Sequence, residues 1–233
     1  MAAAPPSPRR HTRSGNAMKA LLAGGTGLIG SQVLQAALPS LLEICTVGRR
    51  PTGKVANEIV ASFSELQSLP AADVAICALG TTIRRAGSRD AFREVDYQAV
   101  LNFATAAKAA GVPQFIVVTA VGANSQSSVF YSRVKGEVEQ DLKALEFARL
   151  DIIRPGLLMG DRQENRPVES LLKWLAPLTD LGMLGRWRRY RSIHAQQVAH
   201  FLLCIAGCEA PGVFIHHFDE MIAPPKTTEA DVT

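Results

Sequence analysis

Two side chains that could exchange a proton, Tyr131 and Lys135, lie four residues apart in the chain. Residues at this spacing share one face of a helix. An ammonium group beside a phenol stabilises the phenolate and lowers the phenol pKa, so the tyrosine becomes usable as an acid or base near neutral pH. Upstream, Thr119 ends an apolar run and offers a hydroxyl that could bind a substrate oxygen. We therefore expect Thr119, Tyr131 and Lys135 to be catalytic. The alternative is a solvated helix face, since such a pair also arises by chance.

A second group of residues could bind phosphate through the backbone. Glycines stand at positions 24, 27 and 30, directly after an apolar run and before an Ala-rich helical pattern at residues 32–37. Gly24 would permit a tight turn, Gly27 would bring the backbone against a pyrophosphate, and Gly30 would let the helix pack closely on the sheet. The N–H groups at the helix start would then hold the phosphate charge. A strand before the motif and a helix after it are the context of a dinucleotide-binding unit; a structural turn without a ligand is the alternative.

The elements that must position these groups alternate along the chain. Strands are predicted at residues 41–47, 58–63, 73–79, 114–119 and 212–217, and helices at 91–110, 168–175 and 195–206. Runs without polar alternation, such as residues 73–79, are typical of buried parallel strands. The sequence therefore predicts an α/β fold with a doubly wound parallel sheet, whose ligand lies at the carboxyl ends of the strands.

The end of the second predicted strand bears on which dinucleotide would bind. Enzymes that use NAD usually place an acidic residue here for the ribose hydroxyls. This chain has Arg49 and Arg50 instead, and Glu43 lies at the wrong end of the strand to replace the acid. Because guanidinium groups pair bidentately with phosphate, the sequence predicts NADP(H) in preference to NAD(H). A solvated basic turn is the alternative.

Length and composition limit the number of domains and the class of protein. The 233 residues, 47% of them hydrophobic, suit one large domain. We expect a single domain at residues 18–222 with its substrate region mainly at 155–222, a disordered tail at 223–233, and a disordered extension or upstream start at 1–17, with a targeting arm as the less favoured reading. No apolar run approaches the ~20 residues of a membrane span, so no membrane partner is expected. The four cysteines suggest neither a disulfide framework nor a metal site, and the predicted location is the cytoplasm.

The charge argues against a nucleic-acid partner. Three of the four net positive charges come from Arg9, Arg10 and Arg13 in residues 1–17, which contain no acid, so the remainder carries only +1. Among the C-terminal histidines, His200 is predicted to pack in the core. His216 and His217 are adjacent on a strand and point to opposite faces, so they would make a poor chelating pair.

Taken together, the glycine motif, the threonine at the strand end and the Tyr131–Lys135 pair resemble the short-chain dehydrogenase/reductase superfamily. Three further stretches resemble its atypical branch, typified by the Tat-interactive oxidoreductase of animals and its bacterial relatives. They are residues 78–82, 134–139, and 154–158 followed by 161–167. The resemblance covers about residues 18–222.

This resemblance implies an NAD(P)-binding Rossmann fold and a set of cofactor contacts. Arg49 would take the 2′-phosphate, Gly80 and Thr81 would flank the adenosine or phosphates, and Lys135 would bind the nicotinamide ribose. The full implied set is Gly24, Thr26, Gly27, Leu28, Ile29, Gly30, Arg49, Arg50, Leu79, Gly80, Thr81, Tyr131, Lys135, Arg154 and Pro155.

Three functions follow as hypotheses. The first is an NADP(H)-dependent oxidoreductase that moves hydride to or from a small carbonyl or alcohol, as a monomer or homodimer. The second is a dinucleotide-sensing regulatory protein with a protein partner, because many relatives have serine where this chain has Thr119-Ala120 and therefore one hydroxyl fewer. The third is a sugar-nucleotide epimerase or dehydratase, against which the short C-terminal part argues.

Overall fold

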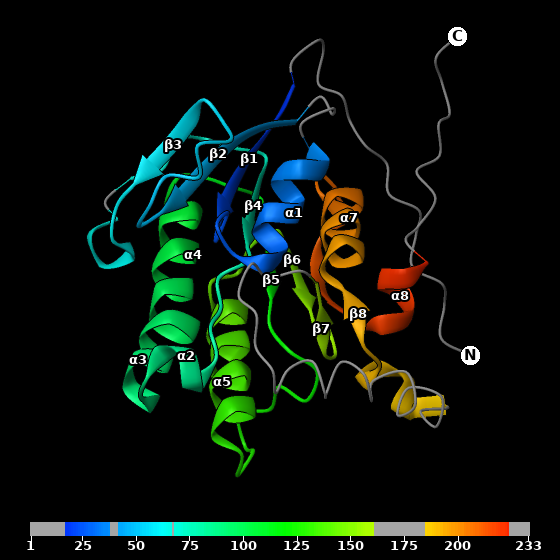
Figure 1. The fold of residues 1–233 in the computed structure, drawn as a ribbon. Helices are drawn as coiled ribbons and strands as arrows, with labels where there is room; N and C mark the ends of the chain where they lie inside the picture. Colours follow the sequence, from blue (N-terminus) through cyan, green and yellow to red (C-terminus); the bar gives the residue numbers. More distant parts are fainter. Residues whose placement is uncertain (1–16, 38–41, 67, 161–184, 224–233) are drawn as a thin grey trace, which may run out of the picture.

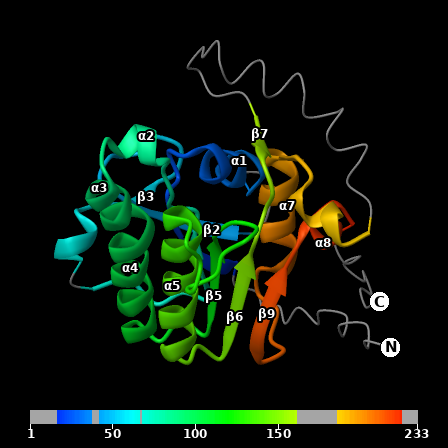
Figure 2. The ribbon, with the colours of Figure 1, turned by 90° about the horizontal axis from the view of Figure 1, so that it is seen from below.

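In the described part of the chain, seven parallel strands form one sheet in the order β3-β2-β1-β4-β5-β6-β9 (Figure 1; β9 is labelled in Figure 2). The computed structural model describes residues 17–37, 42–66, 68–160 and 185–223. The strands are β1 Met18–Ala23, β2 Leu42–Gly48, β3 Asn57–Val60, β4 Val74–Cys77, β5 Gln114–Val118, β6 Arg149–Ile153 and β9 Gly212–His216. Every neighbouring pair is parallel. The doubly wound parallel sheet predicted from the sequence is confirmed, and the order reverses between β1 and β4, where such folds bind their ligands.

Helices cover both faces of the sheet (Figures 1 and 2). On one face α1 (Leu28–Ala37) lies beside α7 (Ala195–Ile205), and on the other face α4 (Ala99–Ala109) lies beside α5 (Phe130–Ala144). The shorter elements are α2 Ile83–Ala86, α3 Arg89–Arg93, α8 Phe218–Ile222, β7 Leu158–Met159, β8 Ile193–His194, and the 3₁₀ turns Phe63–Glu65 and Gly185–Tyr190. Strands β7 and β8 pair with each other in a second, small sheet.

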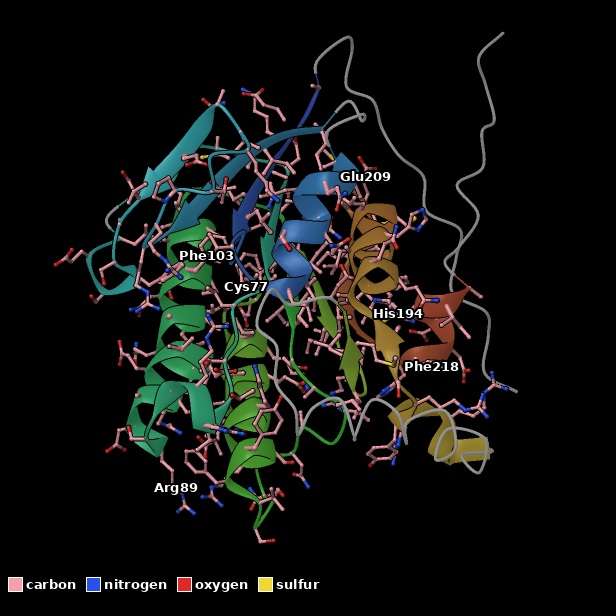
Figure 3. The ribbon with its side chains drawn as sticks, in the orientation of Figure 1. Cys77, Arg89, Phe103, His194, Glu209 and Phe218 are labelled. Carbon is pink, nitrogen blue, oxygen red and sulfur yellow. The ribbon has the colours of Figure 1, made fainter. Side chains whose placement is uncertain are left out.

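Each face of the sheet has its own hydrophobic core. Cys77 and Phe103 belong to the core under α4 and α5, and Phe218 belongs to the core under α1 and α7 (Figure 3). The strands at the centre of the sheet are buried on both faces, as the unbroken apolar runs indicated: every residue of β4 and β5 is buried. The interiors of these strands therefore serve packing, and the candidate functional residues lie at the strand ends, in the loops that follow them and on the adjoining helices.

Several predicted elements differ in detail from the observed ones. The helix expected at residues 91–110 begins at Arg89 and is interrupted by a π-helical turn at Glu94–Gln98. The third strand ends at Val60 rather than Phe63, which instead lies in a 3₁₀ turn. His200 is exposed on α7, so the prediction of a packed core histidine is wrong. The predicted helix at 168–175, the stretch 161–167 and nearly all of both predicted disordered termini lie outside the described residues.

Candidate functional site

The glycine loop between β1 and α1 is shaped by backbone contacts that exclude a side chain. Gly24 has φ +87°, a left-handed conformation, and a Cβ added there would lie 2.6 Å from the Ala78 carbonyl oxygen after β4. A Cβ on Gly30 would lie 2.2 Å from the Gly24 carbonyl oxygen. Gly27 closes the turn by donating its N–H to that same oxygen at 2.9 Å. Because α1 begins at Leu28, its first N–H groups have no partner within the helix and are available to an anion.

A pocket of about 90 Å³ lies against this loop. Its walls come from Gly25 and Thr26 of the glycine loop, from Arg49 and Arg50 after β2, and from Leu79 after β4. Both arginines are exposed. Two guanidinium groups thus stand beside a backbone turn suited to a pyrophosphate. We call the glycine loop between β1 and α1, together with Arg49 and Arg50, the nucleotide end, after the ligand that the sequence predicts.

The conformation of the loop after β2 depends on Glu58, which no sequence motif singles out. The Glu58 carboxylate on β3 accepts hydrogen bonds from the backbone N–H groups of Thr52 and Gly53, each at 3.0 Å, and from the Thr52 hydroxyl. The Thr52 hydroxyl, followed by these backbone groups, holds the pKa of Glu58 below its ordinary value. Glu58 therefore fixes the turn that carries the two arginines.

At the carboxyl end of β4, Lys135 forms a buried ion pair that was not anticipated. Its Nζ lies 2.7 Å from Oδ1 of Asp96, and the two side chains are 4% and 1% exposed. The other oxygen of Asp96 accepts the backbone N–H of Thr81 at 2.8 Å. A Cβ on Gly80 would lie 3.5 Å from Asp96 and 3.9 Å from Lys135, so the pair adjoins the strand end directly.

Tyr131 lies one helical turn before Lys135 on α5, as the spacing predicted. Its ring packs against Phe92 of α3 with centroids 5.5 Å apart. Helix α5 packs directly against the loop that precedes it because Gly136 lacks a Cβ. A Cβ added to Gly136 would lie 2.1 Å from the Ser125 backbone nitrogen. Burial raises the pKa of Tyr131 above its ordinary value, while the charge of Lys135 works in the opposite direction. The lowered phenol pKa expected from the sequence is therefore not what this environment produces.

The Thr119 hydroxyl belongs to a second buried polar cluster. It donates to Oε1 of Glu139 at 2.6 Å, and the same carboxylate pairs with the Arg154 guanidinium through Nε at 3.0 Å and through Nη2. Glu139 is 3% exposed and Arg154 is 20% exposed. In this arrangement the Thr119 hydroxyl points at α5. We call Thr119, Tyr131, Lys135, Asp96, Glu139 and Arg154 the catalytic end, after the role that the sequence predicts for the first three.

The remaining residues of the implied cofactor set lie around these two ends. Ile29 is buried in the core under α1, so its side chain serves packing. Leu28 lies near Gly160, whose Cβ would approach the Leu28 side chain to 2.9 Å. The Pro155 carbonyl accepts the Val121 N–H at 2.9 Å and holds the loop after β5 against the end of β6. All the predicted residues thus lie along the carboxyl edge of the sheet or in the segments that follow it.

Over the described ranges, no three or more His, Cys, Asp or Glu side chains are grouped so that they could hold a metal ion. In the same part of the chain, no helix combines the length and apolarity needed to cross a membrane.

A comparison with protein-family models shows which family the chain belongs to. The HIM1 family model matches residues 30–184, which is more than half of the sequence. The chain belongs to the HIM1 family. The match begins at Gly30, so it covers the catalytic end while most of the glycine loop precedes it.

Fungal proteins are similar over most of their length. Protein FMP52-1, mitochondrial, of Scheffersomyces stipitis is 40% identical over an alignment of 184 residues, and the alignment covers 71% of this chain and 81% of that protein. Protein fmp52, mitochondrial, of Aspergillus fumigatus is 36% identical over an alignment of 170 residues that covers 66% of this chain and 73% of that protein. These relatives carry a mitochondrial designation, and this finding contradicts the cytoplasmic location predicted from the sequence.

Solved structures support the fold. MoeE5 in complex with UDP-glucose and NAD is similar with a TM-score of 0.65 at 16% identity, covering 88% of this chain and 80% of that one. The human epimerase family protein SDR39U1 with NADPH gives a TM-score of 0.61 at 20% identity, covering 86% and 74%. At such identities the likeness concerns the fold alone. It supports a Rossmann-like α/β fold, whereas the resemblance to the short-chain dehydrogenase/reductase superfamily and to its Tat-interactive branch stays a prediction.

Proposed function

We propose that this protein binds NADP(H) along the carboxyl edge of its sheet and transfers hydride to or from a small carbonyl or alcohol. The observation that carries the proposal is the nucleotide end, where a glycine-rich turn before α1 shares one pocket with Arg49 and Arg50. The two similar solved structures contain NAD and NADPH. Their contents agree with a nicotinamide dinucleotide, and the arginine pair favours the form with a 2′-phosphate.

The residues present fit such a cofactor. The turn at Gly24 and Gly27 leaves backbone close to where a pyrophosphate would lie, and a side chain at either position would occupy that space or clash with the strand behind it. Arg49 would hold the 2′-phosphate. Lys135, beside Gly80 at the end of β4, would bind the nicotinamide ribose. The bound nicotinamide would supply or accept the hydride.

In this proposal the proton is handled by Tyr131. Its hydroxyl would donate to the oxygen of a carbonyl substrate, or its phenolate would accept the proton of an alcohol. Phe92 shields one side of the ring from water. Thr119 would orient the substrate oxygen only after its hydroxyl leaves Glu139. Residues Arg154 and Pro155 would border the nicotinamide pocket.

Calorimetric titration with NADPH and NADH tests the cofactor assignment. Replacing both arginines, Arg49→Gln with Arg50→Gln, is expected to weaken NADPH binding about 10- to 100-fold, since charge-assisted hydrogen bonds to the 2′-phosphate are lost. NADH binding should stay within about twofold, because NADH has no such phosphate. Lys54→Gln is the matched control: it removes one exposed positive charge from the same loop outside the pocket. An equal loss of affinity for NADPH and NADH, or no binding of either nucleotide, would overturn the assignment of NADP(H) as the cofactor.

Turnover is tested separately. With the best carbonyl substrate found, Tyr131→Phe is expected to lower kcat by about 100-fold or more while NADPH affinity is kept, because the proton donor is lost and the ring remains. Full turnover in this variant would exclude Tyr131 as the acid.

A second candidate function is a dinucleotide-dependent binding protein without robust turnover. The observation that favours it is the Thr119 hydroxyl, which is engaged by Glu139 in the interior instead of facing a substrate. If this reading holds, NADPH binds, no carbonyl is reduced, and addition of NADPH changes the capture of a defined partner. Turnover that depends on Tyr131 would exclude it.

We further propose a mitochondrial location, on the strength of the designations of the related fungal proteins. Residues 1–17, which contain three arginines and no acid, have the composition of a targeting segment. Imaging of the tagged full chain beside a variant lacking residues 1–17 tests both points. Mitochondrial signal from the full chain supports the location, and its loss on truncation assigns the signal to this segment.

A further inference from the structure

The buried pair of Lys135 and Asp96 carries no net charge. Its two side chains are almost completely excluded from water and stand 2.7 Å apart. Whether the shared proton is on the nitrogen or on the oxygen, the sum of the two charges is zero. Lys135 is therefore not the isolated cation that the Tyr-x-x-x-Lys pattern alone suggests.

Asp96 is held in this position from two directions. Its second oxygen accepts the Thr81 N–H at 2.8 Å, which ties it to the loop after β4. It lies within the π-helical turn Glu94–Gln98, between α3 and α4. A π turn is rare, inserts an extra residue into the helical turn, and is found frequently at functional sites. Its neighbours Glu94 and Gln98 are exposed, whereas Asp96 is fully buried against α5.

The charges around Tyr131 can be enumerated for the described residues. Lys135 on the same helix and Asp96 on the π turn are the charged groups that act on it, and Phe92 from α3 is apolar. Cys77 at the end of β4 also faces Lys135, but burial raises its pKa to about 12, so it stays neutral. With Lys135 neutralised, the phenol keeps the desolvated environment that disfavours its ionised form.

We propose that Asp96 is a positioning residue that neutralises Lys135, keeps Tyr131 protonated, and so sets this site to reduce carbonyl compounds rather than to oxidise alcohols at neutral pH. This inference rests on the proposed function and deepens it by naming the substrate class. In the reduction, the carbonyl carbon would accept a hydride supplied by bound NADPH, and NADP⁺ would be released. The carbonyl oxygen would take the Tyr131 proton, and solvent would return a proton to the phenolate. A tyrosine that stays protonated is ready for this direction, whereas alcohol oxidation needs the phenolate.

The local electrostatics agree with this role. Burial is the main cause that raises the pKa of Tyr131; Lys135 opposes the shift and Asp96 adds to it. Burial alone would lower the pKa of Lys135, but the Asp96 carboxylate outweighs it and the pKa is raised.

The test is an ultraviolet titration of tyrosinate, which needs no turnover. The chain has three tyrosines, Tyr97, Tyr131 and Tyr190, so subtracting the titration of Tyr131→Phe isolates Tyr131. In the unmodified protein we expect Tyr131 to ionise above the ordinary phenol pKa of about 10. In Asp96→Asn, which keeps the shape and an acceptor for Thr81, its pKa should fall by about one unit or more because Lys135 is no longer neutralised.

Asp141→Asn is the matched control. Asp141 accepts the hydroxyl of Tyr97 at 2.5 Å, so the same change of charge beside another tyrosine should alter the titration of Tyr97 and leave that of Tyr131 unchanged. If Asp96→Asn does not fold, as judged by circular dichroism, the titration of the unmodified protein still decides. Ionisation of Tyr131 below pH 10 there would overturn the proposal. So would an unchanged Tyr131 titration in a folded Asp96→Asn.

The pH profile of turnover gives the functional readout. In Asp96→Asn the alkaline decline of carbonyl reduction is expected to begin about one pH unit lower, and alcohol oxidation should gain activity near neutral pH. A fall in activity without a shift of either profile would indicate a merely structural role and overturn the proposal. If NADPH does not bind at all, the proposed function fails, while the tyrosinate titration still tests the action of Asp96 on Tyr131.

Discussion

The nucleotide end and the catalytic end lie along the same edge of the sheet but are built from different interactions. The nucleotide end is shaped by close contacts between backbone segments: Gly24 and Gly30 have no room for a Cβ, and its arginines are exposed. The catalytic end rests on buried charges, in which Lys135 meets Asp96 and Glu139 meets Arg154. The first is therefore fixed by local sterics, and the second by the packing of segments that are distant in the chain.

The largest effect is expected from Gly30→Ala. Its Cβ would lie 2.2 Å from the Gly24 carbonyl oxygen, a backbone atom that cannot move aside, so the loss of stability should be about 3 kcal/mol. Urea denaturation measures it. Gly53→Ala is the control: Gly53 has φ +66° and nothing within 4 Å of its Cβ, so only backbone strain of about 1 kcal/mol is expected. Equal losses in the two variants would mean that sterics do not fix the glycine loop.

At the catalytic end, Glu139→Gln should lower the free energy of unfolding by about 3 kcal/mol, because the largely buried Arg154 loses its counter-charge. Thr119→Val should cost about 1 kcal/mol, the value of one hydrogen bond. A double-mutant cycle with Arg154→Met measures the coupling. Additive losses for Glu139→Gln and Arg154→Met would show that the pair contributes no stability.

Gly27→Ala should act on binding more than on stability. The added Cβ would lie 3.1 Å from the Gly24 carbonyl oxygen, a contact that a small shift relieves. In the proposed function, Gly27 brings the backbone against the pyrophosphate, so the added methyl group would keep the phosphate at a distance. We expect NADPH affinity to fall about 10-fold, or about 1.4 kcal/mol, by calorimetry, with less than 1 kcal/mol lost in urea denaturation. Unchanged affinity would remove Gly27 from the phosphate site.

The smallest effect concerns a third group of charges, at β9. His216 lies 2.9 Å from Asp151 and 2.9 Å from Glu220. Burial lowers the pKa of His216, but these carboxylates outweigh it and the pKa is raised. A raised pKa in the folded state contributes stability that is fully present below about pH 6.5 and is lost as pH rises through the folded value. His216→Gln should therefore cost more stability at pH 6 than at pH 9.

Thermal unfolding of His216→Gln beside the unmodified protein at the two pH values measures this dependence. A difference for His216→Gln that does not change with pH would show that the histidine is not charged in the folded protein.

The sequence predicted the nucleotide end better than the catalytic end. Glycines at fixed spacing between an apolar run and a helix describe a backbone geometry that is local, and the arginines follow a strand whose end the hydrophobic pattern locates. The pair of Tyr131 and Lys135 was also placed correctly on one helix. The partner of Lys135 was missed. From the sequence, Asp96 is an ordinary polar position of a long predicted helix, and no pattern indicates the π-helical turn that buries it.

The sequence by itself therefore determined the class of fold, the glycine turn, the arginine pair and the helical spacing of Tyr131 and Lys135. These depend on hydrophobic periodicity and on the steric freedom of single residues, which are properties of short segments. Only the tertiary structure decided that Lys135 is neutralised by Asp96, that Thr119 turns to Glu139, and that Glu58 holds the loop after β2. The charge and direction of a buried polar group depend on which partner is packed against it, and for these pairs that partner comes from another element of the fold.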